Sequence, residues 1–211
     1  MENKGDVQMA RRVKEFVDRY PIVSLQDLKR PMVFVVDMNN GFLKQGALHD
    51  RGIMECVKPI ETLLQQQIPS IFFTDAHHVQ AMEFDSYPAH CVEGTLECEI
   101  IDELYPYVKS KIEKHSTNAF VSEGFEKFLI EDVYKYDDYI ITGCCSDICI
   151  LQFAMTLKAY FNELEDKNKR IFVPINCIDT FHSDDHDAGY WNEFAISYMK
   201  ANGIHVVSCV K

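Results

Sequence analysis

The stretch ITGCCSDICILQFAMTLKAYF, residues 141–161, runs from a β-branched segment through a glycine and two cysteines into a long segment with helical spacing of apolar residues. Such a sequence predicts a strand, a tight corner and a helix in direct succession. A strand that passes at once into a helix is typical of parallel sheets, because the chain must cross over before the next parallel strand can pair. This corner therefore indicates the α/β class.

The same alternation extends over the rest of the chain. Apolar runs of strand length stand at 32–38, 70–76, 139–143, 170–175 and 203–209, with a weaker one at 107–114. Segments with helical periodicity lie at 52–66, 96–105, 123–132, 147–162 and 187–201. Since near-continuous apolar strands are buried on both faces, we predict a three-layer α/β/α sandwich around a six-stranded, mainly parallel sheet.

The length of 211 residues fits a single core, and no linker composition or internal repeat divides the chain. We expect one α/β domain over residues 31–211. An N-terminal helical extension over residues 1–30, with a helix at about 7–19, would precede it. Ligands of open parallel sheets bind beyond the carboxyl ends of the strands, so polar residues at strand ends are the candidates for a site.

The net charge of −12 disfavours two classes of partner. Such a charge repels nucleic acid and anionic membrane surfaces, so we expect no binding to either. No segment is apolar enough to span a bilayer, and the N-terminus lacks the apolar core of a signal peptide. We therefore expect a cytoplasmic protein, in which the eight cysteines are thiols rather than disulfide partners.

Three strand ends carry residues suited to nucleophilic catalysis. Cys149 lies in the first turn of the helix after the corner, where free N–H groups and the helix dipole favour a thiolate. Asp37, at the end of the first apolar run, is placed to be a partly buried base with a raised pKa. Lys114 would supply a fixed positive charge that lowers the pKa of the cysteine. Taken singly, the cysteine also fits a core position, the aspartate a turn cap and the lysine a solvated surface.

Metal-binding side chains gather in FTDAHHVQAMEFDSYPAHC, residues 73–91. Asp75 and His77 are two residues apart and therefore project to the same side of an extended chain, and His90 follows on the return of the same loop. One carboxylate and two imidazoles suit a divalent first-row metal with positions left open for a ligand, most simply zinc, with iron or manganese as alternatives. His78 is expected to face solvent.

A later stretch, DTFHSDDHD at residues 179–187, also gathers histidines and carboxylates, with His182 and His186 four residues apart. Acidic residues directly before a helical segment are typical of a capped helix start, because they interact favourably with its N-terminal dipole. We therefore predict a helix N-terminus at this point and not a second metal site.

Three of these motifs, in this order, resemble the isochorismatase-like cysteine hydrolases. They are VVDMNNGF with Asp37, KHSTNAF with Lys114, and the corner GCCSDICI with Cys149, of the form G-x-x-[ST]-D-x-C-[VI]. The resemblance covers roughly residues 31–209. It implies an Asp-Lys-Cys triad in which Cys149 attacks an amide carbonyl, Asp37 carries the proton to the leaving ammonia, and water hydrolyses the thioester.

The resemblance also implies a geometry for the corner. Relatives carry a non-proline cis peptide directly before the [ST] of the motif, which corresponds to Cys144–Cys145 in this chain. The backbone amides of Cys145 and Cys149 would then form the oxyanion hole. Most relatives have small apolar residues at positions 144 and 145.

Within this family, the D-x-H followed by YPAHCVEGT is similar to the nicotinamidases, in which a metal holds the ring nitrogen of nicotinamide and presents its carboxamide to the cysteine. Glu83 matches a fourth metal ligand of some bacterial nicotinamidases, or is a solvated loop residue. Phe42 and Tyr87 stand where nicotinamidases present aromatic walls to the ring, or belong to the core.

These observations predict a metal-dependent cysteine amidohydrolase that converts nicotinamide to nicotinate and ammonia in NAD salvage, and that forms a homo-oligomer as its relatives commonly do. Two alternatives stay open. One is a hydrolase of the same family with another small substrate, because KHSTNAF is shorter than the matching segment of many nicotinamidases. The other is a non-catalytic metal-binding protein on this fold.

Overall fold

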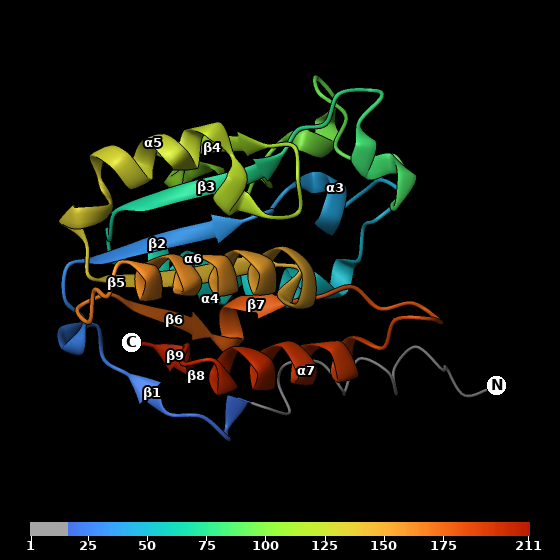
Figure 1. Ribbon diagram of the computed structural model, residues 1–211. Helices are drawn as coiled ribbons and strands as arrows, with labels where there is room; N and C mark the ends of the chain where they lie inside the picture. The colour runs from blue at the N-terminus through green and yellow to red at the C-terminus, as the bar shows by residue number, and fades with distance from the viewer. Residues whose placement is uncertain (1–16) are drawn as a thin grey trace.

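The computed structural model describes residues 17–211 and contains one central parallel sheet (Figure 1). Its strands are β2 (Pro31–Val36), β3 (Ser70–Asp75), β4 (Lys111–Lys114), β5 (Asp138–Cys144), β6 (Arg170–Pro174), β7 (Ile178–Asp179) and β8 (His205–Val207). The sheet has seven strands and not the six expected, because the two-residue β7 pairs with β5 beyond the end of β6. The other six correspond to the predicted apolar runs.

The strand order is β4-β3-β2-β5-β6-β8, so the direction of winding reverses between β2 and β5. Such a reversal leaves a crevice at the carboxyl ends of the two central strands, which is where open α/β sheets bind their ligands. Gly143 permits the close approach of these strands: its φ is +113°, and a Cβ atom there would lie 1.9 Å from the Val36 carbonyl oxygen. Only glycine fits this position.

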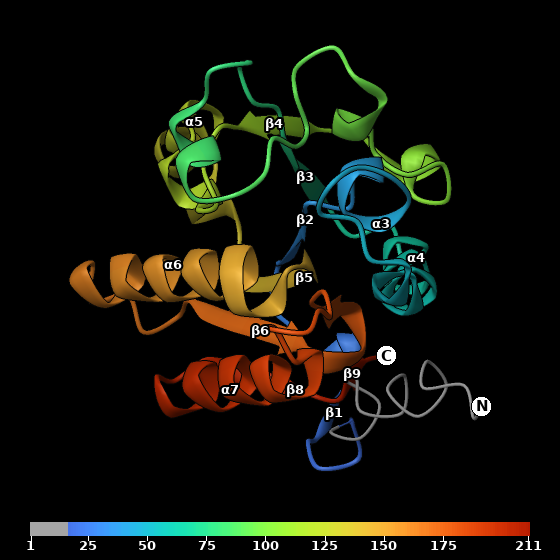
Figure 2. The same ribbon diagram turned by 90° about the vertical axis from the view of Figure 1, so that its right-hand side faces the viewer.

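Helices cover both faces of the sheet, as predicted for a three-layer sandwich (Figure 2). One face carries α5 (Glu123–Glu131), α6 (Leu151–Glu163) and α7 (Ala188–Ala201), and the other carries α3 (Asn40–Leu43) and α4 (Val57–Leu64). Two apolar clusters fill the spaces between the layers. In the first, the Phe34 ring lies 5.3 Å from that of Phe153 and 5.7 Å from that of Phe125, which joins β2 to α5 and α6.

The segment 96–105 does not form the helix that its periodicity predicts. It contains two short 3₁₀ turns, Leu96–Cys98 and Tyr105–Tyr107, separated by irregular chain. Its backbone is bound to the loop after β2: the Asn40 N–H donates to the Glu99 carbonyl, and the Ile101 N–H donates to the Met38 carbonyl. Tertiary pairing therefore outweighs the local propensity for a helix.

The predicted helix at 7–19 lies outside the described residues except for its last three positions. After it, β1 (Ile22–Val23) pairs in parallel with β9 (Cys209–Val210) and forms a separate two-stranded sheet. The proposed boundary at residue 30 stays a prediction.

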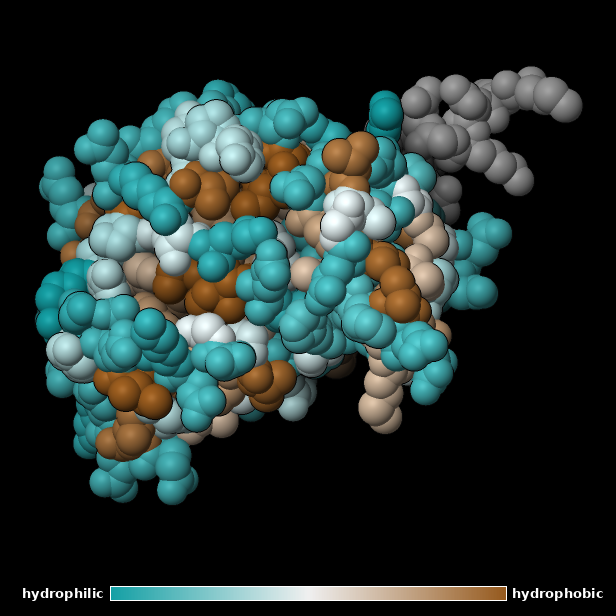
Figure 3. Space-filling view, turned by 90° about the horizontal axis from the view of Figure 1, so that it is seen from above, coloured by the Kyte–Doolittle hydropathy of each residue, from teal (hydrophilic) through white to brown (hydrophobic). Residues whose placement is uncertain are grey.

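The outer surface is mixed in character. From the side of α5 and the edge strand β4, apolar patches are interrupted by hydrophilic side chains (Figure 3). Within residues 17–211, no helix is both long and apolar enough to cross a membrane.

Candidate active site

A cavity of about 470 Å³, partly open to solvent, lies at the carboxyl ends of the central strands. It is lined by Asp37, Phe42, Leu48, Asp75, Glu83, Tyr87, His90, Thr117, Cys145, Ile148, Cys149 and Phe181. The crevice predicted from the sheet topology is therefore the place where the sequence-predicted residues meet.

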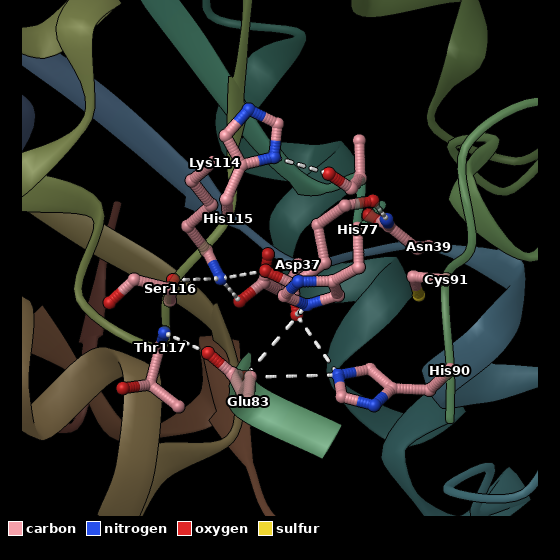
Figure 4. Close-up of polar contacts among 12 residues, drawn as sticks. Asp37, Asn39, His77, Glu83, His90, Cys91, Lys114, His115, Ser116 and Thr117 are labelled. Carbon is pink, nitrogen blue, oxygen red and sulfur yellow. Dashed lines mark hydrogen bonds and ion pairs between the residues drawn. The ribbon is translucent and has the colours of Figure 1, made fainter. Parts of the chain in front are cut away.

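Lys114, the last residue of β4, is completely buried and lies between two carboxylates. Its Nζ is 2.8 Å from Asp37 Oδ2, donates to Asp75 Oδ1, and donates to the Ser116 carbonyl at 3.0 Å (Figure 4). Burial alone would lower the pKa of Lys114, but Asp37 and Asp75 raise it well above its ordinary value. The ammonium is therefore a permanent positive charge beside both carboxylates.

Asp37 directly follows β2 and is fully buried, with φ at +55°. Burial raises the pKa of its carboxyl, the nearby Asp75 charge raises it further, and Lys114 opposes both, which leaves the pKa at about 7. The neighbouring Cys149 thiol makes the smallest of the contributions that lower the pKa of the same carboxyl. Asp37 can therefore take or return a proton near neutral pH.

Cys149 lies in a π-helical turn, Ser146–Ile150, that leads into α6. Burial raises the pKa of its thiol well above the ordinary value, and the opposing effect of Lys114 is smaller. The effect of Lys114 on the pKa of this thiol has the predicted direction, but desolvation outweighs it, so the net pKa is raised. A thiol with a raised pKa needs a base in order to react, and Asp37, whose charge acts on this thiol, is the candidate.

The corner between β5 and this turn contains the non-proline cis peptide Cys144–Cys145 that the resemblance implied. The two cysteine side chains have different surroundings. Cys145 lines the cavity, whereas the Cys144 thiol lies in the core and donates to the Asp37 carbonyl at 3.0 Å. Cys145 and Cys149, the two residues predicted to form an oxyanion hole, thus both face the cavity.

Beside the triad, Asp75, His77, Glu83 and His90 form a group whose ligand atoms all lie within 4.8 Å of one another. His77 Nε2 is 3.5 Å from Asp75 Oδ2 and 3.8 Å from Glu83 Oε1. His90 Nε2 is 3.6 Å and 3.8 Å from the same two atoms. Figure 4 shows that His77, Glu83 and His90 converge on one point.

The surroundings of these four residues fit a divalent metal. His90 Nδ1 lies 2.8 Å from the Pro88 carbonyl, which orients Nε2 toward the group, and the Thr117 N–H donates to Glu83 Oε2 at 3.1 Å. His77 is fully buried, and neither of its ring nitrogens has a hydrogen-bond partner among residues 17–211. Since buried polar atoms without partners are rare and costly, the ring is suited to metal ligation.

Both predicted aromatic walls line the cavity. The Phe42 ring lies 5.6 Å from that of His90, and the Tyr87 ring lies 6.3 Å from it on another side. Sequence reasoning missed Phe181, which comes from the irregular loop after β7 and lines the same cavity. It also missed Thr117, next to the KHS of the lysine motif, where proximity to Lys114 was a usable signal.

The histidines that were assigned outside the site are indeed elsewhere. His78 is exposed. His182 Nδ1 accepts from the Ala188 N–H at 3.2 Å at the start of α7, and His186 Nε2 lies 2.9 Å from Asp147 Oδ2. Neither belongs to the four-residue group, which agrees with a helix start at this point.

The isochorismatase domain family matches residues 31–208, which include every residue of the site. The chain belongs to the isochorismatase family. It is similar to nicotinamidase 1 of Arabidopsis thaliana, with 28% identity over 177 residues that cover 74% of this chain and 68% of the relative. The protein is therefore an isochorismatase-family hydrolase with nicotinamidase relatives.

Two solved structures illustrate the shared fold. The N-carbamoylsarcosine amidase of Thermoplasma acidophilum matches with a TM-score of 0.65 and 23% identity, over 85% of this chain and 96% of that chain. The pyrazinamidase of Pyrococcus horikoshii in complex with zinc matches with a TM-score of 0.68 and 18% identity, over 85% of this chain and 99% of that chain.

Proposed function

We propose that this isochorismatase-family hydrolase is a metal-dependent nicotinamidase, which hydrolyses nicotinamide to nicotinate and ammonia through a thioester on Cys149. One observation carries the proposal: Cys149 lines the same cavity as Asp75, Glu83 and His90. The candidate nucleophile and three residues of the candidate metal-binding group therefore line one cavity. Nicotinamidase 1 of Arabidopsis thaliana is similar in sequence, which supports the choice of amide.

Asp37 would receive the Cys149 proton as the sulfur attacks the carboxamide carbon. The backbone amides of Cys145 and Cys149 would donate to the developing oxyanion. Asp37 would next protonate the leaving ammonia, leaving a thioester on Cys149. It would then take a proton from the attacking water and return that proton to the Cys149 sulfur as the thioester breaks. Lys114 stays charged throughout and stabilises Asp37 whenever that carboxyl is ionised.

The metal would be held by Asp75, His77, Glu83 and His90. We propose zinc as the metal, because the pyrazinamidase of Pyrococcus horikoshii was solved in complex with zinc. A bound divalent ion would supply a Lewis-acid contact for the ring nitrogen of the substrate. Phe42 and Tyr87 would confine the flat ring between aromatic walls. Restricting the ring in this way raises the effective concentration of the carboxamide at the thiol.

The proposal is tested by measuring ammonia release from nicotinamide with metal-loaded protein, together with elemental analysis. Release that is lost in Cys149→Ala and accompanied by about one bound metal per chain is the expected result. Trapping of the wild-type thiol by a nicotinaldehyde-type electrophile would identify the nucleophile independently. Undiminished ammonia release in Cys149→Ala would contradict the covalent route.

A hydrolase for another small amide is the second candidate, favoured by the fold shared with an N-carbamoylsarcosine amidase. Turnover of a linear amide with no turnover of nicotinamide would select it. A non-catalytic metal-binding protein would bind zinc but leave Cys149 unreactive toward the electrophile. The role in NAD salvage, the cytoplasmic location and the homo-oligomer stay predictions.

A further inference from the structure

The loop between β7 and α7, residues 180–187, is the part of the cavity wall that the proposed mechanism does not use. Its Phe181 lines the cavity together with Phe42 and Tyr87. The cavity therefore has a third aromatic residue, supplied by a segment without regular secondary structure. An irregular loop can hold a wall in place only if other elements fasten it.

One attachment joins this loop to the wall that carries Phe42. The His182 N–H donates to Asp50 Oδ2 at 2.8 Å. The Asp50 N–H in turn donates to the Phe42 carbonyl at 2.9 Å. The two aromatic walls are thus connected through a single aspartate.

A second attachment runs through His186. Its ring stacks on Phe181, with centroids 3.9 Å apart and planes 13° apart, and on Trp191, at 5.3 Å and 8°. Nδ1 lies 2.9 Å from the Phe181 carbonyl, and Nε2 lies 2.9 Å from Asp147 Oδ2. A carbonyl and a carboxylate accept, so the ring nitrogen of His186 that carries the proton is the donor in its contact.

Asp147 connects this attachment to the nucleophile. It lies two residues before Cys149 in the turn Ser146–Ile150, and its side chain is only 5% exposed. The set of Phe181, His186, Trp191 and Asp147, here called the His186 clasp, therefore ties the third wall to the turn that carries the reactive sulfur. Because each member is held by a ring stack or a short hydrogen bond, Phe181 has little freedom to move away from Cys149.

We propose that His186 is a positioning residue that sets substrate specificity: through the clasp it fixes Phe181, so that the cavity accepts flat, unsubstituted aromatic amides and rejects rings with added substituents. This inference rests on the proposed amidase function. A wall that cannot move penalises each extra methyl group, whereas a loose wall accommodates it. The clasp acts on the fit of the ring and not on the bonds made or broken at Cys149.

His186→Phe is the informative variant, because phenylalanine keeps a ring between Phe181 and Trp191 but cannot donate to either acceptor. The matched control is His205→Phe. That histidine also stacks on an aromatic ring, Phe172, at 4.9 Å and 22°, but it is exposed and lies in β8 away from the cavity. Both variants therefore replace a stacked histidine by the same residue.

We expect the KM of His186→Phe for nicotinamide to rise about tenfold while kcat changes less than about threefold, because ring binding and not chemistry is affected. The preference for nicotinamide over a ring-methylated nicotinamide should fall by about tenfold, the size of a one-methyl discrimination. His205→Phe should change neither quantity. His186→Gln keeps a hydrogen-bond donor but has no ring. If this variant retains the preference for nicotinamide, the hydrogen bonds of His186 rather than its ring stacking fix Phe181.

Trp191 is the only tryptophan of the chain, so its emission spectrum reports on the clasp without turnover. The emission spectrum of Trp191 should change in His186→Phe and stay the same in His205→Phe. A His186→Phe protein that melts at a lower temperature but keeps its KM and its preference would overturn the inference and leave His186 a structural residue only.

Failure of the proposed function gives a different result. Wild-type protein would then release no ammonia from either amide. In that case, the affinities of wild type and His186→Phe for nicotinamide and for the ring-methylated nicotinamide are measured by calorimetry. The inference holds if wild type binds nicotinamide more tightly than the methylated amide and His186→Phe does not. Any other result refutes it.

Discussion

The two ends of the central sheet both bury charged residues, but they satisfy them in different ways. At the amino end, buried Asp138 accepts from Arg170 Nε at 2.7 Å, from Arg170 Nη2 at 2.5 Å and from the Lys29 N–H at 2.6 Å. At the carboxyl end, within residues 17–211, neither the side-chain oxygens of Asp37 nor the ring nitrogens of His77 have a hydrogen bond of good geometry, although Asp37 forms an ion pair with Lys114.

This contrast separates a structural ion pair from a site that is arranged for ligands. A complete set of hydrogen bonds offsets the cost of burying a carboxylate, and such a site contributes to stability alone. Incomplete hydrogen bonding next to a cavity leaves atoms that a metal, a substrate or a transferred proton can engage. Substitutions at the two ends should therefore have opposite effects on activity and stability.

The largest effect is expected at the nucleophile. Cys149→Ala should lower kcat by about 10⁴-fold or more, since the remaining groups cannot form the covalent intermediate. The melting temperature should change little, because only one sulfur atom is removed. Cys177→Ala, another buried thiol but one outside the cavity lining, is the control and should retain kcat. Equal activity losses in the two variants would mean that the effect is general to the core.

Loss of a metal ligand should rank second. His77→Ala should lower kcat/KM by about 10³-fold and abolish binding of the metal, because the substrate is no longer oriented. His78→Ala, next in the chain but exposed, should have no effect on either quantity. Elemental analysis and ammonia release measure both. A His77→Ala protein that keeps its metal would show that the group of four is not the binding site.

At the amino end the loss should be one of stability. Arg170→Ala removes both guanidinium donors from buried Asp138, and such unpaired buried charges cost about 3 kcal/mol. Urea unfolding should show the loss, while kcat at low denaturant stays at the wild-type level. A fall in kcat without a fall in stability would contradict the division between the two ends.

The smallest effect concerns pH. Because the pKa of Asp37 is raised to about 7, mainly by burial, kcat/KM should fall about tenfold per pH unit on the acid side as the base becomes protonated. A metal bound at Asp75 adds positive charge and moves this limb to lower pH. A profile that stays flat to well below pH 3.8, the ordinary pKa of an aspartate, would exclude Asp37 as the base.

Stability should respond to the same group in the opposite sense. The folded pKa of Asp37 exceeds its unfolded value of 3.8, so the folded state binds more protons in between. Its contribution to the free energy of unfolding is therefore present at low pH and is lost as pH rises through about 7. Activity and this contribution thus change in opposite directions, which distinguishes protonation of Asp37 from acid unfolding.

Much of the site was predictable because its residues stand in short, ordered motifs. The local geometry of the site could be predicted from three motifs: the D-x-H, the lysine of the weak strand and the cysteine corner. These motifs lie close together because each stands at the carboxyl end of a parallel strand. Phe181 was not predictable in this way, because no periodicity or spacing marks a side chain on an irregular loop. The helix expected at 96–105 failed for the related reason that its backbone pairs with residues 38–40.

The sequence by itself determined the parallel layered architecture and the identity of the triad and metal-ligand candidates, because alternation, turn residues and ligand spacing are properties of neighbouring positions. Only the tertiary structure decided that Lys114 lies between Asp37 and Asp75, and that burial raises the pKa of Cys149. It alone joined Phe181 to the turn that carries Cys149, through His186. Burial, electrostatic coupling and stacking depend on distances between segments far apart in the chain, which no local pattern contains.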